Sequence, residues 1–307
     1  MTSNSGGMSA YTLKAAAATS AIALMLVPLA GNADDSRESF ASVTPVWQGN
    51  TDFDNGGDFE ATGLVVRLGT QTRFGEGHRG GISLQYDGID YDFSRRTPFG
   101  GAPWGNVQRI GLNLPFAFRG ENDWTYGVAP SVEWARENGA DWSDSLVYGA
   151  MFSATRSFAP DKRLGLGLGA YSHIEENRLV PLVIVDWSLN ERWRLVNPLP
   201  AGPAGPAGLE LDYRFDNGWN VGLGAAYRSI RFRLSDHGPV RNGVGEESGV
   251  PVFLRASTRF GASSSFFVYA GAVLSGELRV ENSNGTKLSD ESFETAPLFG
   301  ATFSTRF

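Results

Sequence analysis

The chain ends with SFETAPLFGATFSTRF, residues 292–307, and this stretch decides the fold class. In its final part Phe299, Phe303 and Phe307 fall on one face, while Gly300 and Arg306 fall on the other. A period of two residues is that of a β-strand. At the edge of a soluble sheet such an apolar strand would leave unpaired backbone groups exposed to aggregation. In a closed barrel it becomes the closing strand.

These alternating apolar residues and the terminal Phe resemble the C-terminal signature of Gram-negative outer-membrane β-barrels. The resemblance implies that Phe299, Phe303 and Phe307 form an assembly signal, read by the barrel-assembly machinery. The machinery is then an expected partner of the chain.

The N-terminal segment predicts export. Lys14 precedes an apolar run over residues 15–30, which is followed by small residues up to Ala33. This order is typical of a secretory signal peptide, so we expect residues 1–33 to be removed and residues 34–307 to form the barrel in the bacterial outer membrane.

Composition excludes several other classes of protein. The chain has no cysteine, so neither disulfides nor thiolate metal sites are available. Its formal net charge of −7 argues against a nucleic-acid binder, which needs a basic face. The sequence predicts no cofactor and no bound metal. Membrane lipid and lipopolysaccharide are the expected partners of the outer surface.

Alternation of apolar and polar residues recurs along the chain and predicts an all-β, antiparallel up-and-down transmembrane barrel of 14 strands. The number falls to 12 if the first and ninth segments are not wall strands. At Gly88 the phase of the alternation slips by one residue, which predicts a β-bulge. The predicted strands are residues 40–47, 64–71, 82–93, 110–119, 124–134, 146–157, 164–174, 180–189, 193–197, 209–215, 219–234, 250–259, 266–281 and 299–307.

The connections between these segments alternate between long and short, as in outer-membrane barrels. The segment NPLPAGPAGPAG, residues 197–208, is rich in proline and predicts a stiff loop. The connection near Glu176 is short where the scheme expects a long one. The long connections lie near residues 50, 97, 139, 203, 241 and 286.

The order of NPLPAGPAGPAGLEL, GLGAAYRSIRFRL, GVPVFLRASTRFG and YAGAVLSGELRVE, followed by the Phe307 ending, resembles a family of Gram-negative outer-membrane β-barrel proteins known only as a domain of unknown function. The resemblance is best over residues 179–307. It implies a location and a fold, and it brings no catalytic residues.

If the apolar face of each strand meets lipid, the charged face lines the lumen. Arginine dominates this face, and arginine keeps its charge at all working pH values. The predicted lumen or pore residues are Arg67, Asp87, Asp90, Asp92, Arg109, Glu133, Glu210, Asp212, Arg214, Arg231, Arg233, Arg255, Arg259, Glu277 and Arg279. Two arrangements fit them: an Arg wall along a narrow pore, or a lumen closed by mutual salt bridges. Barrels of this size lie between filled and open ones, so size does not decide.

Two further motifs have a possible chemical role. Asp52–Glu60 is spaced somewhat like a calcium loop, but Gly56 replaces one oxygen ligand and Gly63 the closing Glu, which favours a solvated acidic loop. An outer-membrane lipid hydrolase would need a histidine, and His173 is the best placed. Its neighbour Ser172 points to the opposite face of the strand, so no catalytic residues are assigned.

The sequence therefore favours a passive, porin-like channel or small-solute transport barrel with an Arg-rich lumen. A closed structural or adhesion barrel that acts through its outer loops is the main alternative, and a lipid hydrolase is the third.

Overall fold

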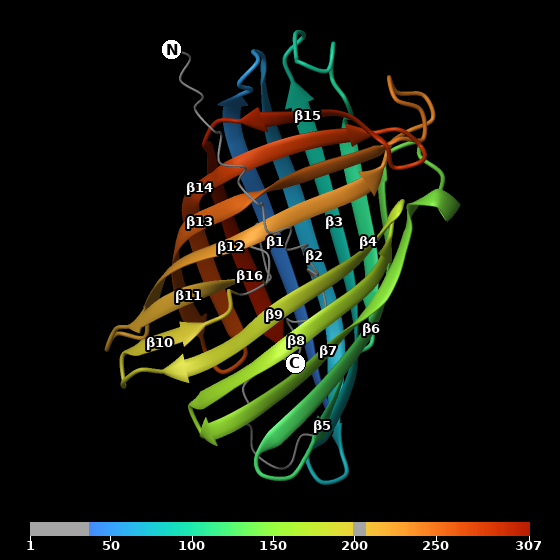
Figure 1. The fold of residues 1–307 in the computed structure, drawn as a ribbon. Coiled ribbons are helices and arrows are strands. Elements are labelled where there is room, and N and C mark those ends of the chain that lie inside the picture. Colours follow the sequence, from blue (N-terminus) through green and yellow to red (C-terminus); the bar gives the residue numbers. More distant parts are fainter. Residues whose placement is uncertain (1–36, 199–206) are drawn as a thin grey trace, which may run out of the picture.

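A computed structural model of the chain describes residues 37–198 and 207–307, and the predicted signal peptide lies outside them. Figure 1 shows one antiparallel sheet that curls into a barrel. Among the described residues no helix is long and apolar enough to cross a membrane. The elements are β1 (Arg37–Asp52), β2 (Asp58–Phe74), β3 (His78–Phe93), β4 (Asn106–Asn113), β5 (Phe116–Arg119), β6 (Trp124–Glu137), the 3-10 turn η1 (Ser143–Ser145), β7 (Leu146–Ala159), β8 (Lys162–His173), β9 (Glu176–Ser188), β10 (Trp193–Val196), β11 (Ala207–Arg214), β12 (Asn220–Arg233), β13 (Val244–Phe260), β14 (Ser264–Glu281), β15 (Lys287–Phe293) and β16 (Ala296–Arg306).

The wall contains 14 strands, as predicted. The segments β4 and β5 both pair with β3 and β6, so they are two halves of one wall strand. In the same way β15 and β16 both pair with β14. The sheet closes where β16 pairs with β1, and the backbone of Phe307 exchanges hydrogen bonds of 2.9 and 3.0 Å with Ser39. The final segment is thus the closing strand.

The two ends of the barrel differ. The turn end carries Phe307 and the short connections, such as residues 75–77 and 160–161. The loop end carries the longer connections, including residues 94–105 and 234–243. The connection at residues 174–175 is the short exception that the sequence indicated.

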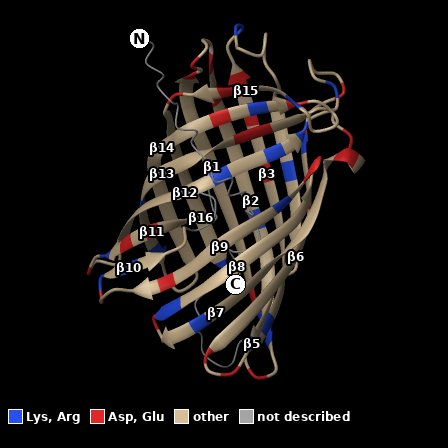
Figure 2. Ribbon diagram, viewed as in Figure 1, with Lys and Arg blue, Asp and Glu red and all other residues tan. Residues whose placement is uncertain are grey.

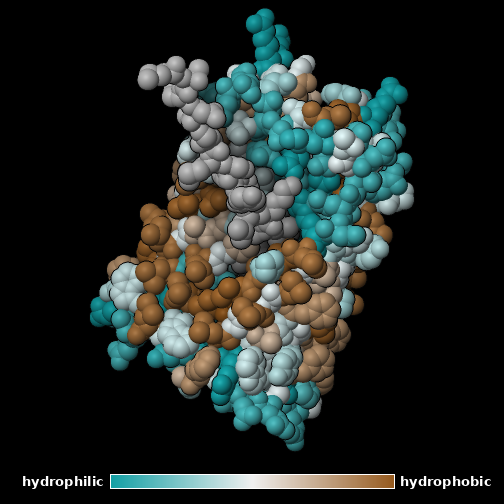
Figure 3. All heavy atoms as spheres, viewed as in Figure 1, coloured by the Kyte–Doolittle hydropathy of each residue, from teal (hydrophilic) through white to brown (hydrophobic). Residues whose placement is uncertain are grey.

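The outer surface of the turn half is an apolar belt, visible as the brown zone in Figure 3 and as a zone with few charged residues in Figure 2. Aromatic rings lie toward its edges: Trp47 packs on Phe299 at 5.4 Å, and Trp193 packs on Tyr213 at 4.8 Å nearer the turn end. Aromatic girdles at both rims are typical of membrane barrels. The belt includes the exposed side chains Val43, Leu68, Leu84, Tyr126, Phe152, Leu166, Leu223, Leu254, Val268 and Phe303.

Side-chain polarity inverts part-way along β3. In the turn half Ile82, Leu84 and Tyr86 face outward, whereas in the loop half Ile89 and Tyr91 face inward. The pairing with β2 and β4 runs through this point without a register shift. The predicted bulge at Gly88 is therefore wrong. The apolar residues move from the outer to the inner face because the surroundings of the outer surface change along the barrel. The register of the backbone pairing stays the same.

The interior of the loop half is filled by the aromatic cluster, which consists of Phe53, Phe59, Tyr91, Phe93, Phe99, Trp104, Phe232 and Phe293. Phe59 meets Phe293 edge-on at 5.0 Å, and Trp104 meets Phe232 edge-on at 5.1 Å. Such contacts are favourable geometries for aromatic rings. The loop half thus has the arrangement of a water-soluble barrel, with an apolar interior and a polar outer surface.

One joint of the wall lacks a backbone ladder. The strand β9 pairs with the short β10 only from Asp186 to Ser188, and β11 pairs with β12 only up to Tyr227. In the described part of the chain, no rungs join residues 176–184 of β9 to residues 228–233 of β12. Near the loop end β12 instead meets β6, where the backbones of Arg233 and Arg136 form a parallel β-bridge. We call this joint the seam between β9 and β12.

Two leucines with similar exposure test where the belt ends. Leu84 is 52% exposed in the belt, and Leu288, on β15 in the loop half, is 56% exposed. We expect Leu84→Arg to lower the free energy of unfolding by about 2–4 kcal/mol, because the new charge must lie in hydrocarbon. Leu288→Arg should change it little. Guanidinium titration in lipid vesicles measures both values, and equal losses would contradict this placement of the belt.

Candidate functional site in the barrel interior

A chain of polar side chains crosses the inner faces of β2, β3 and β4. Arg67 donates through Nε to Gln85 Oε1 at 3.2 Å, and Gln85 donates to Asp87 Oδ2 at 2.7 Å. Arg109 donates through Nε to the same Asp87 oxygen at 2.9 Å, and Glu133 lies 3.8 Å from Arg109. A charge-assisted bond of this kind is stronger than a neutral one. Four predicted residues, Arg67, Asp87, Arg109 and Glu133, are thus brought together.

A second polar group lies just below the aromatic cluster. Arg228 forms an ion pair with Glu247 and donates to Gln48 Oε1 at 2.8 Å. The hydroxyl of Tyr91 donates to Glu247 at 2.5 Å, which ties this group to the aromatic cluster. The residues predicted to line the lumen do not include Gln48, Arg228 or Glu247. Alternation along the strands does not reveal these residues, because the polarity of the inward face inverts within the strands that carry them.

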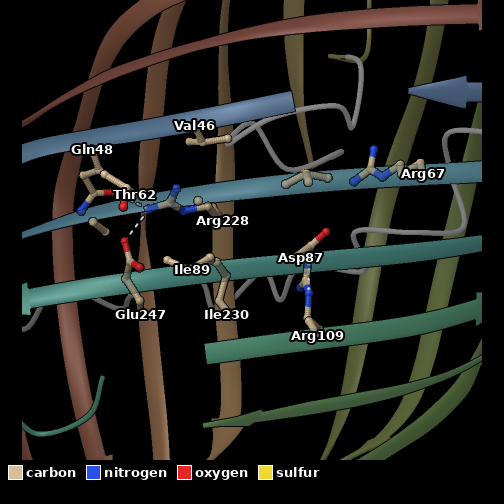
Figure 4. Close-up of a pocket in the computed structure, with 13 residues that line it drawn as sticks. Val46, Gln48, Thr62, Arg67, Asp87, Ile89, Arg109, Arg228, Ile230 and Glu247 are labelled. Carbon is tan, nitrogen blue, oxygen red and sulfur yellow. Dashed lines mark hydrogen bonds and ion pairs between the residues drawn. The ribbon is translucent and has the colours of Figure 1, made fainter. Parts of the chain in front are cut away.

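A cavity of about 60 Å³ lies between these two groups. Figure 4 shows Arg67, Asp87 and Arg109 toward one side, and Gln48, Arg228 and Glu247 toward the other. Apolar side chains lie between them, among them Val46, Ile89 and Ile230. The cavity is therefore polar at both ends and apolar in the middle.

A third group occupies the interior of the turn half. Arg255 donates to Glu210 at 2.7 Å and to both oxygens of Asp212 at 3.2 Å. Gly222 makes this possible, since a Cβ there would lie 2.0 Å from a Glu210 oxygen. Arg194 of β10 forms an ion pair of 2.6 Å with Asp186 of the neighbouring strand β9. In this group, Arg255 and Arg194 are thus held in ion pairs with the carboxylates of Glu210, Asp212 and Asp186.

Arg231 does not face the lumen, because its neighbours Ile230 and Phe232 do. It lies at the seam, where it reaches Glu246 at 3.1 Å, Glu281 at 2.5 Å and the carbonyl of Ile174 at 2.9 Å.

Arg178, from β9, completes this bridge and reaches Glu246 at 2.7 Å. Beside it Arg233 reaches Glu175 at 2.6 Å. Side-chain ion pairs therefore hold the seam where the backbone ladder is missing.

The predicted lumen residues divide into three sets. Arg67, Asp87, Arg109, Glu133, Glu210, Asp212 and Arg255 face the interior. Arg214 and Arg259 share the inward face of their strands but are exposed at the turn end. The prediction is wrong for Asp90, Asp92, Arg231, Arg233, Glu277 and Arg279, which lie on the opposite face of β3, β12 or β14.

The remaining sequence motifs have plain structural positions. Phe299, Phe303 and Phe307 are exposed on the outer face, and their role as an assembly signal stays a prediction. The predicted loop from Asp52 to Glu60 is partly strand: only residues 53–57 connect β1 to β2, and Phe53 and Phe59 pack in the aromatic cluster. No group of acidic or histidine side chains in the described residues is arranged to hold a metal ion.

His173, the residue considered for a lipid hydrolase, makes a local contact: its Nδ1 accepts a hydrogen bond from the backbone N–H of Ile174 at 2.9 Å.

The closed antiparallel wall and its apolar belt define a β-barrel of the outer-membrane type. No protein-family profile matches the chain, and no curated protein matches it.

Solved structures of similar topology share little sequence with it. An outer membrane channel from Pseudomonas putida F1 has a TM-score of 0.47 and 10% identity, over 91% of this chain and 100% of that one. The P. putida toluene transporter TodX has a TM-score of 0.42 and 11% identity, over 90% and 91%. The Ralstonia pickettii toluene transporter TbuX has a TM-score of 0.42 and 12% identity, over 95% of each chain.

The seam predicts an unequal response to two arginine substitutions. The side chain of Arg231 is 1% exposed, whereas Arg192, which pairs with Asp216 at the turn end, is 53% exposed. Arg231→Ala should lower the free energy of unfolding by about 3–5 kcal/mol, since it leaves buried carboxylates unpaired. Arg192→Ala should cost under about 1 kcal/mol. Denaturant titration of both variants checks this, and similar losses would refute the bridging role of Arg231.

Proposed function

We propose that this chain is a transport barrel of the bacterial outer membrane, which admits small solutes through a gated interior. The observation that carries the proposal is the cavity between Arg67 and Arg228, an unfilled space within a charged lumen and directly below the aromatic cluster. The apolar belt supports the location, and the loop end would then face the outside. Membrane lipid, lipopolysaccharide and the barrel-assembly machinery are the proposed partners.

The filled loop half argues against a wide diffusion pore. The aromatic cluster occupies the interior, and Phe59 and Phe232 are fully buried within it. A passage must therefore open by a rearrangement of this cluster. Trp104 and Phe99 come from the connection between β3 and β4, and a loop can move without breaking a strand ladder. This connection is the proposed gate.

The same cluster favours a second candidate, a closed barrel with a structural or adhesive role. In that case the loop-half interior is simply a core that supports the outer loops. The two candidates differ in one property: a transport barrel lets solute reach the lumen of a vesicle, and a closed barrel does not.

Vesicle experiments separate the candidates. We expect folded wild-type protein to admit small solutes into liposomes while showing little steady conductance. Trp104→Ala with Phe232→Ala should produce a clear increase in single-channel conductance, because the substitutions empty the centre of the aromatic cluster. Phe158→Ala, on the exposed outer surface, is the matched control and should behave as wild type. Protein that is heat-modifiable on gels, and therefore folded, yet admits no solute would support the closed barrel instead.

A further inference from the structure

The cavity between Arg67 and Arg228 contains buried polar atoms whose hydrogen-bonding capacity is unused. Arg228 Nε and Gln48 Nε2 are buried donors, and Asp87 Oδ1 is a buried acceptor, and none of the three has a partner. All three residues line the cavity. Buried polar atoms in proteins are normally paired, so these three atoms show that the cavity is lined by hydrogen-bonding groups within reach of a bound molecule or of water.

Arg67 gives the sign of the charge that a ligand would carry here. The residue is only 9% exposed, and its Nε donates to the neutral amide of Gln85. Within the described residues no carboxylate lies within 4.0 Å of its guanidinium, since Asp87 pairs with Arg109 instead. Asp87 and Glu133 lie in the same group and act on Arg67 only at longer range, and a buried cation without a direct ion pair is costly. An anionic group beside Arg67 would remove this cost.

The cavity walls fix the size and the character of the rest of the ligand. Val46, Val65, Ile89 and Ile230 supply an apolar lining between the two polar ends. The volume of about 60 Å³ is well below the roughly 150 Å³ of an apolar cavity that holds benzene. A short aliphatic group matches this volume, whereas an aromatic ring is larger than it.

We infer that the cavity binds a small aliphatic monocarboxylate of acetate to propionate size. Its carboxylate meets Arg67, and its carbon chain lies between Ile89 and Ile230. As a statement about which solute the barrel carries, the inference rests on the proposed transport function. As a statement about binding, it stands on the cavity alone.

Isothermal titration of the folded protein in detergent, with sodium propionate as the probe, tests the binding. We expect wild type to bind propionate, and Arg67→Gln to weaken the binding at least about tenfold by removing a charge-assisted contact. Propionamide, which has the same shape without the charge, and benzoate, which is too large, should not bind. Arg194→Gln is the control, since this lumen arginine pairs with Asp186 away from the cavity.

A second variant covers the case in which Arg67→Gln fails to fold. Ala61 lines the cavity, so Ala61→Leu fills space and keeps every charge; it should abolish propionate binding. Folded wild type that does not bind propionate, or variants that bind it as wild type does, would overturn the inference.

Parallel uptake assays with propionate in liposomes keep the two proposals apart. Binding without uptake overturns the transport function and leaves the site standing. Uptake of small solutes that is indifferent to Arg67→Gln and to Ala61→Leu leaves the transport function standing and overturns the statement that the barrel carries its solute through this cavity.

Discussion

Backbone pairing in hydrocarbon is the constraint on which this structure depends. An amide or carbonyl that meets lipid cannot hydrogen-bond to water, so a sheet that crosses a membrane must close on itself. Here closure is made by the last residues of the chain, which pair with β1 on one side and with β14 on the other. The apolar belt follows from the same constraint, because the closed wall must also present side chains that lipid accepts.

The belt covers only part of the barrel height, and this explains the interior. Beyond the belt the outer face is polar, as at Asp90 and Arg279, and apolar side chains such as Tyr91 and Leu278 turn inward. The loop half is then stabilised by an apolar core, as soluble proteins are. The turn half instead has a charged lumen, part of which is held in ion pairs such as those of Arg255. The cavity lies at the boundary between the apolar core and the charged lumen, where neither kind of packing fills the interior completely.

Sequence alone predicted the fold well because alternation and closure are local patterns. The strand count, the closing strand at Phe307 and the short exception at residues 174–175 all follow from the order of side chains. The lumen was harder to predict, because a strand pattern shows which residues share a face and not which face is inside. The inversion on β3 and β12 therefore misplaced Asp92 and Arg231. The pairing of Arg228 with Glu247 joins positions from two strands, and no single-strand pattern shows it.

The seam between β9 and β12 gives the wall a preferred place to yield. Elsewhere neighbouring strands separate only if a row of backbone hydrogen bonds breaks together, which is a cooperative event with a high threshold. At the seam the joint consists of discrete contacts around Arg178, Glu246 and Arg231, and these can release one at a time. Within the described residues, the wall's resistance to opening at this joint therefore rests on side-chain ion pairs and not on a backbone ladder.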